Sequence, residues 1–391
     1  MKKVLLTASS YEHVLNFHIP YLEAFRQHGW ETHAVAAKLP RDLPGADRAI
    51  DLPFRKQGNV IKNLTTVLRL RHLIRKERYD LIITHTTLGA FLTRLAVLFM
   101  PKRPRLVYMC HGYLFSPDMP WHKNLLLRFA ERITAPVTDL LLTMNQYDYQ
   151  AARKHRYSRH IESVPGIGVD FSAFDHTPKT DRKRLRQTYG IPERAVVLIY
   201  AAEFSGRKCQ QILIDAMELL PEDVYLALPG AGRFLEECAA LAAKYGNRVI
   251  FPGYVEDTAP WYAMADIAVT SSRSEGLPFN VMEAMHMGLP VVASAVKGHV
   301  DLITENETGL LYPYGASAAC AEKILRLIAD PDLQKKLSAG AKAMIGRYSL
   351  KNVMPVVMEQ YFSILSGDMV PSNTSHPGGE SNEQEEAGSS V

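Results

Sequence analysis

Long apolar runs are missing from this chain of 391 residues, although 47 % of its residues are hydrophobic. The longest apolar stretch, residues 90–100, carries Arg94 and is much shorter than the roughly 18 to 20 residues that span a bilayer. The apolar run that follows Lys2 and Lys3 stops at Ser9, well short of the core of a secretory signal. We therefore expect no membrane-spanning helix and no signal peptide, and we expect the N-terminal run to form a first buried strand.

Cysteine is also scarce, and its spacing excludes the usual cysteine-based sites. The four cysteines, Cys110, Cys209, Cys238 and Cys320, form no Cys-x-x-Cys and no His/Cys ligand pattern, so we expect a reduced, cytoplasmic protein without structural zinc. The ordinary share of charged residues, 22 %, excludes disordered and fibrous classes, and the length is sufficient for two hydrophobic cores.

Positive charge is concentrated in the first half of the chain. Residues 1–170 hold 25 Lys and Arg against 14 Asp and Glu, whereas residues 171–391 hold 20 against 27. The basic half has three possible interpretations: a solvated helix face, peripheral contact with an anionic membrane, and nucleic-acid binding. No aromatic interleaving or nucleic-acid motif accompanies the charge, so we expect no nucleic-acid partner. Much of this charge lies in Lys56, Lys62, Arg69, Arg71, Arg75, Lys76, Arg78, Lys102, Arg103 and Arg105.

Short runs of Val, Ile and Leu alternate with helical patterns along the whole chain, which is typical of parallel sheets wrapped by helices. Two such series predict an α/β protein with two doubly wound domains. The predicted strands are 3–8, 32–36, 81–84, 106–110 and 139–143, then 196–202, 224–228, 249–251, 267–270, 291–293 and 310–312. The clearest predicted helices are 17–28, 60–78, 333–345 and 350–365, the last with a kink at Pro355.

A turn-rich and then highly charged stretch between about residues 165 and 190 marks the join between the domains. We predict a first domain over 1–170 and a second over 171–349. Residues 367–391 contain five acidic residues and no Lys or Arg, so we expect them to be disordered.

The segment 271–285 carries the densest chemical signal. It follows a predicted buried strand, passes through a turn and enters a helix, which directs unpaired N–H groups and the positive end of the helix dipole at an anion. Glu275 and Glu283 would flank that anion, where carboxylates accept hydrogen bonds from sugar hydroxyls. In the simpler alternative, Glu275 only complements the helix dipole and Glu283 is a solvated helix residue.

Arg207 and Lys208 follow another predicted strand and are placed to bind a dianion at the carboxyl edge of a sheet. The alternative is an ordinary pair of surface cations. The nearby Gly230-Ala231-Gly232 is a weaker phosphate candidate.

In their order and spacing, these segments resemble the retaining GT-B glycosyltransferases of the family 4 group, particularly bacterial members that build capsular polysaccharide or exopolysaccharide. The resemblance extends over about residues 1–365 and implies two Rossmann-like domains that face each other across a cleft, with the last helix crossing back to the first domain. The matching segments are Arg207-Lys208, the Glu-x7-Glu motif at Glu275 and Glu283, residues 164–170, Gly298-His299-Val300-Asp301 and Gly309-Leu310-Leu311.

The resemblance implies roles on the donor side. Arg207 and Lys208 match the pair that binds the donor diphosphate, Glu283 the carboxylate that holds the ribose, and Glu275 the one that contacts the donor sugar. The N–H groups of Leu277 to Phe279 would bind phosphate or sugar. The predicted donor-binding residues are Arg207, Lys208, Gly276, Leu277, Pro278, Phe279, Asn280 and Glu283; the predicted catalytic residues are His111, Arg207, Lys208 and Glu275.

On the acceptor side, His111 matches the family's active-site histidine near the transferred sugar. His85, at the end of a predicted strand, is an acceptor-side candidate, with a purely structural histidine as the alternative. Where many relatives have a glycine-rich loop after the first strand, residues 7–13 are polar, so we add Ser10, His13 and Asn16 as acceptor-side candidates. The departures at Gly166 and at Gly298-His299 leave the acceptor open.

The reaction implied is transfer of a hexosyl unit from a nucleotide sugar, which we expect to be UDP-linked, to a hydroxyl of a polysaccharide or lipid-linked oligosaccharide precursor, with retention at the anomeric carbon. No Asp-x-Asp follows a predicted strand, so we expect no metal and no other cofactor; fixed cations and N–H dipoles would stabilise the leaving group. Two alternatives are a nucleotide-sugar epimerase, for which we find no acid/base set, and a non-catalytic nucleotide-sugar or lipid-binding protein.

Overall fold

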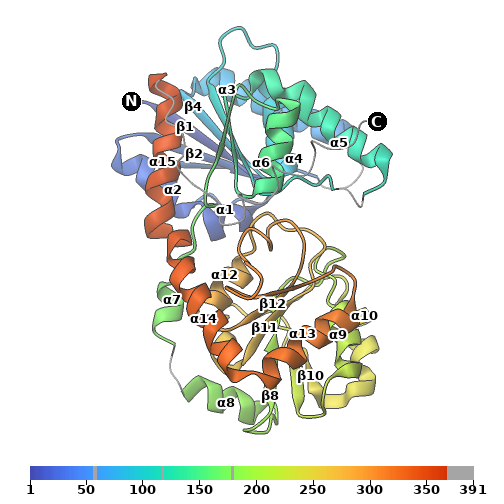
Figure 1. Ribbon diagram of the computed structural model, residues 1–391. Coiled ribbons are helices and arrows are strands. Elements are labelled where there is room, and N and C mark those ends of the chain that lie inside the picture. Colours follow the sequence, from blue (N-terminus) through green and yellow to red (C-terminus); the bar gives the residue numbers. More distant parts are fainter. Residues whose placement is uncertain (56–59, 117–118, 178–179, 368–391) are drawn as a thin grey trace, which may run out of the picture. The chain divides into compact units, whose positions relative to one another are not determined.

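The computed structural model describes residues 1–55, 60–116, 119–177 and 180–367, and it divides the chain into two compact units (Figure 1). Unit 1 comprises Met1–Ile167 together with the C-terminal helix from Val353 onward, and unit 2 comprises Gly168–Asn352. The predicted disorder beyond Gly367 lies outside the described residues, as do Lys56 and the side chain of Lys62.

Unit 1 contains a parallel sheet of seven strands in the order β3-β2-β1-β4-β5-β6-β7. Its strands are β1 (Lys3–Thr7), β2 (Glu31–Ala36), β3 (Arg48–Asp51), β4 (Leu81–His85), β5 (Arg105–Cys110), β6 (Leu140–Thr143) and β7 (His160–Ser163). Its helices are α1 (Tyr11–Phe17), α2 (Ile19–Gln27), α3 (Val60–Glu77), α4 (Thr87–Val97), α5 (Trp121–Thr134), the 3-10 turn η1 (Ala135–Val137) and α6 (Gln146–His155).

Helices cover both faces of this sheet because successive side chains of a strand point to opposite sides. In β1, Leu5 packs in the cluster formed with α3 and α4, whereas Leu6 packs with Val14 and Leu22 of α1 and α2. The helix predicted over 17–28 corresponds to α2, whereas α1, which His18 separates from α2, was not predicted. The edge strands β3 and β7 were missed because they are largely half-buried or exposed and carry no apolar run.

Unit 2 contains a parallel sheet of six strands in the order β10-β9-β8-β11-β12-β13. Its strands are β8 (Val196–Ile199), β9 (Val224–Ala227), β10 (Val249–Ile250), β11 (Ile267–Thr270), β12 (Val291–Ser294) and β13 (Leu310–Tyr312). Its helices are α7 (Ser172–Asp175), α8 (Thr180–Thr188), α9 (Gln211–Ala216), η2 (Met217–Leu219), α10 (Leu235–Ala242), η3 (Ala243–Arg248), α11 (Ala259–Met264), α12 (Phe279–His286), α13 (Ser317–Ala329), α14 (Pro331–Ile345) and η4 (Gly346–Tyr348).

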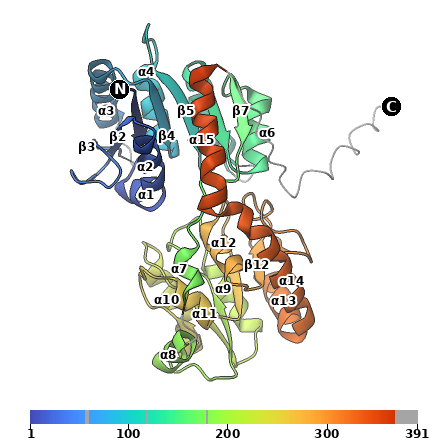
Figure 2. The same ribbon diagram turned by 90° about the vertical axis from the view of Figure 1, so that its left-hand side faces the viewer.

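The final helix, α15 (Leu350–Ser366), returns the chain to unit 1, as predicted (Figure 2). Tyr361 stacks on Phe25 of α2, with ring centroids 6.1 Å apart, and Phe362 packs edge-on against the same ring at 5.4 Å. The helix runs through Pro355. Its start is fixed by a hydrogen bond within unit 2, in which the N–H of Leu350 donates to Val169 O at 2.8 Å.

Each sheet has one point at which the strand order reverses direction, between β1 and β4 in unit 1 and between β8 and β11 in unit 2. In open parallel sheets, ligands bind beyond the carboxyl ends of the strands at such a point. Among the helices of the described residues, none is long and apolar enough to cross a membrane.

Candidate functional site

The donor-side residues lie at the reversal point of unit 2. Arg207 and Lys208 follow β8, and Glu275 follows the neighbouring β11. Lys208 Nζ donates to Glu275 Oε1 at 2.7 Å, and Arg207 forms an ion pair with Glu275 Oε2. The structure therefore brings together the two cations and the carboxylate that lie 67 and 68 positions apart in the sequence.

The ion pairs decide the protonation of Glu275, which is only 7 % exposed. Burial by itself would raise the pKa of this carboxyl, but the charges of Lys208 and Arg207 outweigh burial and hold its pKa well below its usual range. Burial also lowers the pKa of Lys208, and Glu275 offsets part of this effect. Glu275 thus stabilises a charged Lys208 at a buried position.

A serine and a tyrosine, neither of them among the predicted site residues, fix the position of Glu275. Ser272 Oγ donates to Glu275 Oε1 at 2.6 Å, and the same Oγ lies 2.7 Å from the hydroxyl of Tyr200. Both side chains are buried. A signal for Ser272 was present, because this residue lies two positions after the end of β11 in the chemically dense segment, but its partner hydroxyl on Tyr200 is distant in sequence.

Glycine is required beside the carboxylate. Gly298 has φ +83°, and a Cβ at this position would lie 2.7 Å from the Cβ of Glu275. Gly230 and Gly232 have a different role, because a Cβ there would lie 2.0 Å and 2.3 Å from the carbonyl oxygens of Ala202 and Phe204. These two glycines allow two loops to approach closely. This close packing explains why glycine occurs at both positions, and no phosphate-binding role is needed to explain it.

Glu283 lies in α12 in a less polar setting. The hydroxyl of Tyr262 donates to Glu283 Oε2 at 3.1 Å and to Asn280 O at 3.2 Å. Burial raises the pKa of Glu283 to about 7, with the Tyr262 hydrogen bond acting in the opposite direction. The side chain of Asn280 donates to Ala201 O at 3.2 Å and so connects the start of α12 to the segment that follows β8.

The start of α12 corrects one prediction. Pro278 is the N-cap residue of α12 and, as a proline, has no N–H, so it cannot donate to a phosphate as part of the expected Leu277 to Phe279 set. Leu277 is buried, while Gly276 and Phe279 flank the turn that leads into the helix. The contribution of Pro278 is its fixed φ, which directs the chain into the first helical turn.

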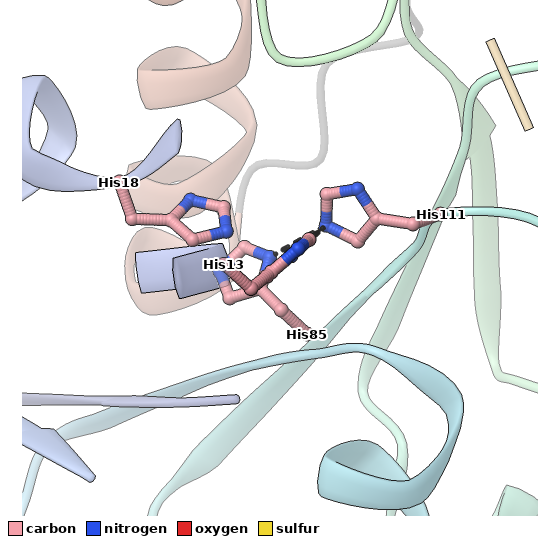
Figure 3. A group of neighbouring side chains, drawn as sticks. All are labelled: His13, His18, His85 and His111. Carbon is pink, nitrogen blue, oxygen red and sulfur yellow. Dashed lines mark hydrogen bonds between the residues drawn. The ribbon is translucent and has the colours of Figure 1, made fainter. Parts of the chain in front are cut away.

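The acceptor-side histidines lie at the reversal point of unit 1. His85 ends β4 and His111 follows the adjacent β5; His85 Nδ1 is 3.0 Å from His111 Nε2. His13 of α1 is 3.4 Å from the same Nε2. The unpredicted His18, at the junction of α1 and α2, has its ring 3.7 Å from that of His85, centroid to centroid (Figure 3).

Burial, together with the neighbouring rings, lowers the pKa of His18, His85 and His111 well below the ordinary value for histidine. These three rings are therefore uncharged at neutral pH. Among the hydrogen bonds of the described residues, none joins the side chains of Ser10 or Asn16 to the histidines: Ser10 is the N-cap residue of α1, and Asn16 is exposed on that helix.

The chain has two doubly wound units, and one of them holds a cation pair with a buried carboxylate at its reversal point. This combination defines the GT-B class of nucleotide-sugar glycosyltransferases. Residues 181–344 match the family described as Glycosyl transferases group 1, and residues 21–170 match Glycosyltransferase Family 4. The protein that carries the name glycosyltransferase EpsD in Bacillus subtilis (strain 168) is 32 % identical over 374 residues, covering 94 % of this chain and 98 % of that protein. The chain belongs to this glycosyltransferase family and is a hexosyltransferase that uses nucleotide sugars.

Other relatives are more distant. An Escherichia coli enzyme named UDP-Gal:alpha-D-GlcNAc-diphosphoundecaprenol alpha-1,3-galactosyltransferase is 24 % identical over 269 residues, which cover 65 % of this chain and 67 % of that enzyme. The crystal structure of Anabaena HepE with UDP and glucose has a TM-score of 0.76 at 22 % identity and covers 93 % of this chain and 100 % of that one. The GT-B fold predicted from the sequence is confirmed.

Proposed function

We propose that this enzyme transfers a hexosyl unit from a UDP-linked sugar to a hydroxyl of a polysaccharide or lipid-linked oligosaccharide precursor, in the synthesis of capsule or exopolysaccharide, with retention at the anomeric carbon. The observation that carries the proposal is the arrangement of Arg207, Lys208 and Glu275 at the carboxyl edge of the unit 2 sheet. The E. coli relative named above acts on a UDP-sugar and a diphosphoundecaprenol-linked acceptor by its name, which supports both substrate classes.

The cation pair is suited to a departing diphosphate. Transfer leaves negative charge on the nucleoside diphosphate, and cations that are fixed in place stabilise this charge without reorganisation. Glu275 holds both cations in position before the donor arrives, since each is paired with one of its oxygens. We therefore assign Glu275 a positioning role toward Arg207 and Lys208 in addition to the sugar contact that the family resemblance implies. In this scheme the leaving group needs no metal.

In this proposal, Glu283 binds the ribose. Its carboxyl has one hydroxyl partner, Tyr262, and a ribose hydroxyl that donates to it would favour the ionised form, because a hydrogen bond to the charged state stabilises that state.

Among the acceptor-side candidates, His111 is assigned to the transferred sugar. Its neutral ring can donate or accept a hydrogen bond at a sugar hydroxyl without adding charge.

The membrane-contact part of the proposal moves from α3 to α5. Arg71, one of the basic residues expected to meet lipid, instead donates from Nη1 to Leu98 O at 2.8 Å and to Ala96 O at 3.3 Å. Helix α5 exposes large apolar side chains, and Lys123 and Arg132 are also exposed on it. An amphipathic helix with exposed tryptophan and basic residues is suited to the interface of an anionic membrane. The exposed apolar residues are Trp121, Leu125, Leu126 and Phe129.

A donor panel tests the function. The full chain is incubated with single UDP-sugars and with a lipid-diphosphate-linked sugar acceptor, and UDP release, acceptor mass and the anomeric configuration of the product by NMR are measured. We expect UDP release coupled to one added hexose with the donor's configuration retained. An isomerised donor without acceptor product, or an inverted linkage, would contradict the proposal. Lys208→Ala serves as the reference with strongly reduced activity.

A further inference from the structure

Four histidines of unit 1 converge on one point, although they come from four places in the fold. His13 lies in α1, His18 at the junction of α1 and α2, His85 at the end of β4, and His111 directly after β5. Each ring offers one nitrogen, and these four nitrogens all lie within 4.8 Å of one another (Figure 3). Such a convergence of imidazoles needs a physical explanation beyond the packing of the sheet.

The spacing of the nitrogens is close to that of a metal site. In a tetrahedral zinc site with Zn–N bonds of about 2.0 to 2.1 Å, the ligand nitrogens are about 3.3 to 3.4 Å apart. The separation between His13 Nε2 and His111 Nε2 is 3.4 Å, and that between His85 Nδ1 and His111 Nε2 is 3.0 Å. Two separations are thus near this value, and all four ligand nitrogens lie within 4.8 Å of one another, so rotations of the rings that bring the remaining nitrogens closer would surround one ion.

Hydrogen bonds among the rings do not satisfy the cluster. His18 and His85 are each 1 % exposed, and the Nε2 atom of each has no hydrogen-bond partner. His111 Nε2 faces two ring nitrogens at once, and a neutral ring nitrogen carries either a proton or a lone pair. His85 faces His111 through its Nδ1, so the unpaired atom that bears on the cluster is His18 Nε2. Buried polar atoms in proteins are normally paired, so an unpaired nitrogen of the buried His18 beside these rings points to a ligand.

The chemistry of the ligand set selects the class of ion. The group consists of four imidazoles and contains no carboxylate and no thiolate. Imidazole suits zinc, copper, nickel and cobalt, whereas magnesium and calcium require oxygen ligands. His13 and His111 are half-buried and His18 and His85 are buried, so an ion can enter from the side of the first pair.

We propose that His13, His18, His85 and His111 together bind one divalent transition-metal cation, and that Zn2+ is the ion that fits this set. The binding site is independent of the transferase assignment, because it is defined by geometry within unit 1. It is also distinct from the leaving-group site, whose cations are side chains of unit 2.

Direct metal binding tests the proposal. The full chain without a histidine tag is stripped with chelator and dialysed against Zn2+, and bound zinc is counted by mass spectrometry; Co2+ is added in parallel, and its visible absorption is recorded. We expect one zinc per chain, the intense visible bands of tetrahedral cobalt, and a higher melting temperature with zinc. Absence of stoichiometric zinc at micromolar concentration would overturn the proposal.

Matched variants separate the site from adventitious binding. His13→Ala, at a half-buried position, and His18→Gln, which keeps a polar side chain, should each weaken Zn2+ binding by about 100-fold or more. His160→Ala removes an exposed histidine of β7 and should leave binding unchanged. Circular dichroism confirms that each variant is folded. Equal zinc binding in His13→Ala and His160→Ala would refute the site.

One consequence rests on the proposed function. If His111 contacts the transferred sugar, zinc bound at this cluster removes its Nε2 from catalysis, so Zn2+ should inhibit UDP release and EDTA should restore it. Stoichiometric zinc without inhibition would support the metal site and refute the role of His111 at the sugar. Inhibition without stoichiometric binding would refute the metal site.

Discussion

At the scale of single residues, the buried carboxylate of Glu275 explains how the neighbouring cations Arg207 and Lys208 can be accommodated in the loop that follows β8. Two neighbouring cations repel each other unless a shared anion offsets their charge. Here each cation contacts a different oxygen of Glu275. The net charge of this trio is positive, which leaves the site attractive to a diphosphate. The exposed fraction of Arg207, 44 % of its side chain, leaves its guanidinium accessible to a ligand.

The first prediction concerns this cation pair. Arg207→Ala and Lys208→Ala should each lower kcat/KM by about 30- to 1000-fold, equivalent to about 2 to 4 kcal/mol, because each removes a fixed charge from the leaving group. Arg207→Lys should recover only part of the loss, since an ammonium cannot replace the planar fork of a guanidinium. Steady-state UDP release measures these effects, with Lys244→Ala at an exposed surface pair as the control.

The same assay tests the metal-free leaving group. Activity should persist in EDTA after the protein has been stripped of metal. If EDTA abolished activity and Mg2+ or Mn2+ restored it, the role assigned to Arg207 and Lys208 would be wrong.

The second prediction concerns Glu283, whose pKa burial raises to about 7. Near pH 6 the free enzyme therefore holds this carboxyl mostly protonated, whereas ribose hydroxyls bind best to the ionised form. Binding of UDP-glucose should release a proton below pH 7, and its affinity should rise between about pH 6 and pH 8 and then level off. Calorimetry in two buffers with different ionisation enthalpies measures the released proton.

Glu283→Gln is the matched control for this experiment. It keeps the shape of the side chain and cannot ionise, so both the proton release and the pH dependence of UDP-glucose affinity should disappear. UDP-glucose is used rather than UDP because the diester has no phosphate group that titrates in this range. An unchanged pH profile in Glu283→Gln would rule out Glu283 as the titrating group.

At the scale of elements, α15 is the segment whose removal should have the largest effect. Its apolar face belongs to the core of unit 1, where Tyr361 and Phe362 pack on Phe25. Burial of each large apolar side chain stabilises the fold by about 1.5 to 3 kcal/mol, so the loss of several exceeds the stability of a typical domain, about 5 to 15 kcal/mol. The buried apolar residues of α15 within unit 1 are Val353, Val357, Met358, Tyr361 and Ile364.

The third prediction follows from this packing. A chain that ends at Ser349 should lack a cooperative thermal transition for unit 1 and should be inactive, whereas a chain that ends at Gly367 should keep the melting temperature and activity of the full chain. Tyr361→Ala, a milder change, should destabilise the protein by about 3 to 5 kcal/mol in urea unfolding. An active, cooperatively folded 1–349 chain would show that α15 is dispensable.

At the scale of the whole molecule, the proposed membrane contact rests on the excess of positive charge in the first half of the chain and on the exposed apolar side chains of α5. The helix is held to the rest of unit 1 by a buried ion pair, in which Glu131 of α5 accepts from both terminal nitrogens of Arg94 at 2.8 and 3.1 Å. In the proposed membrane contact, a helix held in this way would insert the exposed rings of Trp121 and Phe129 at the membrane surface without unfolding.

The fourth prediction is that Trp121→Ala combined with Phe129→Ala reduces sedimentation with anionic phospholipid vesicles by about tenfold or more, while turnover of a soluble acceptor analogue stays within twofold. Binding of the unchanged protein should weaken as salt increases, because screening reduces the attraction to anionic lipid. Leu219→Ala, an exposed apolar residue of unit 2, is the control. Vesicle binding that is insensitive to both the double substitution and salt would contradict a docking role for α5.

The amino-acid sequence determined the two doubly wound units and nearly all of their central strands. The buried strands carry continuous apolar runs, such as 81–84 and 267–270, and this pattern is local. The edge strands β3 and β7 escaped detection because half-exposed strands need no such run. Helix α1 was not predicted because its 7 residues are too few to show a clear helical period. Arg207, Lys208 and Glu275 could be chosen from their positions after strands.

Only the tertiary structure decided which side chains meet. His13 and His18 are five positions apart, but His85 and His111 lie far along the chain from both, so the sequence does not show that the four rings meet. Nor does it show that Tyr200 would hold Ser272 in place beside Glu275. These contacts depend on the order of strands in each sheet, which places β4 beside β5 and β8 beside β11. Strand order results from packing over the whole domain rather than from any local pattern, which is why the segments could be predicted and their convergence could not.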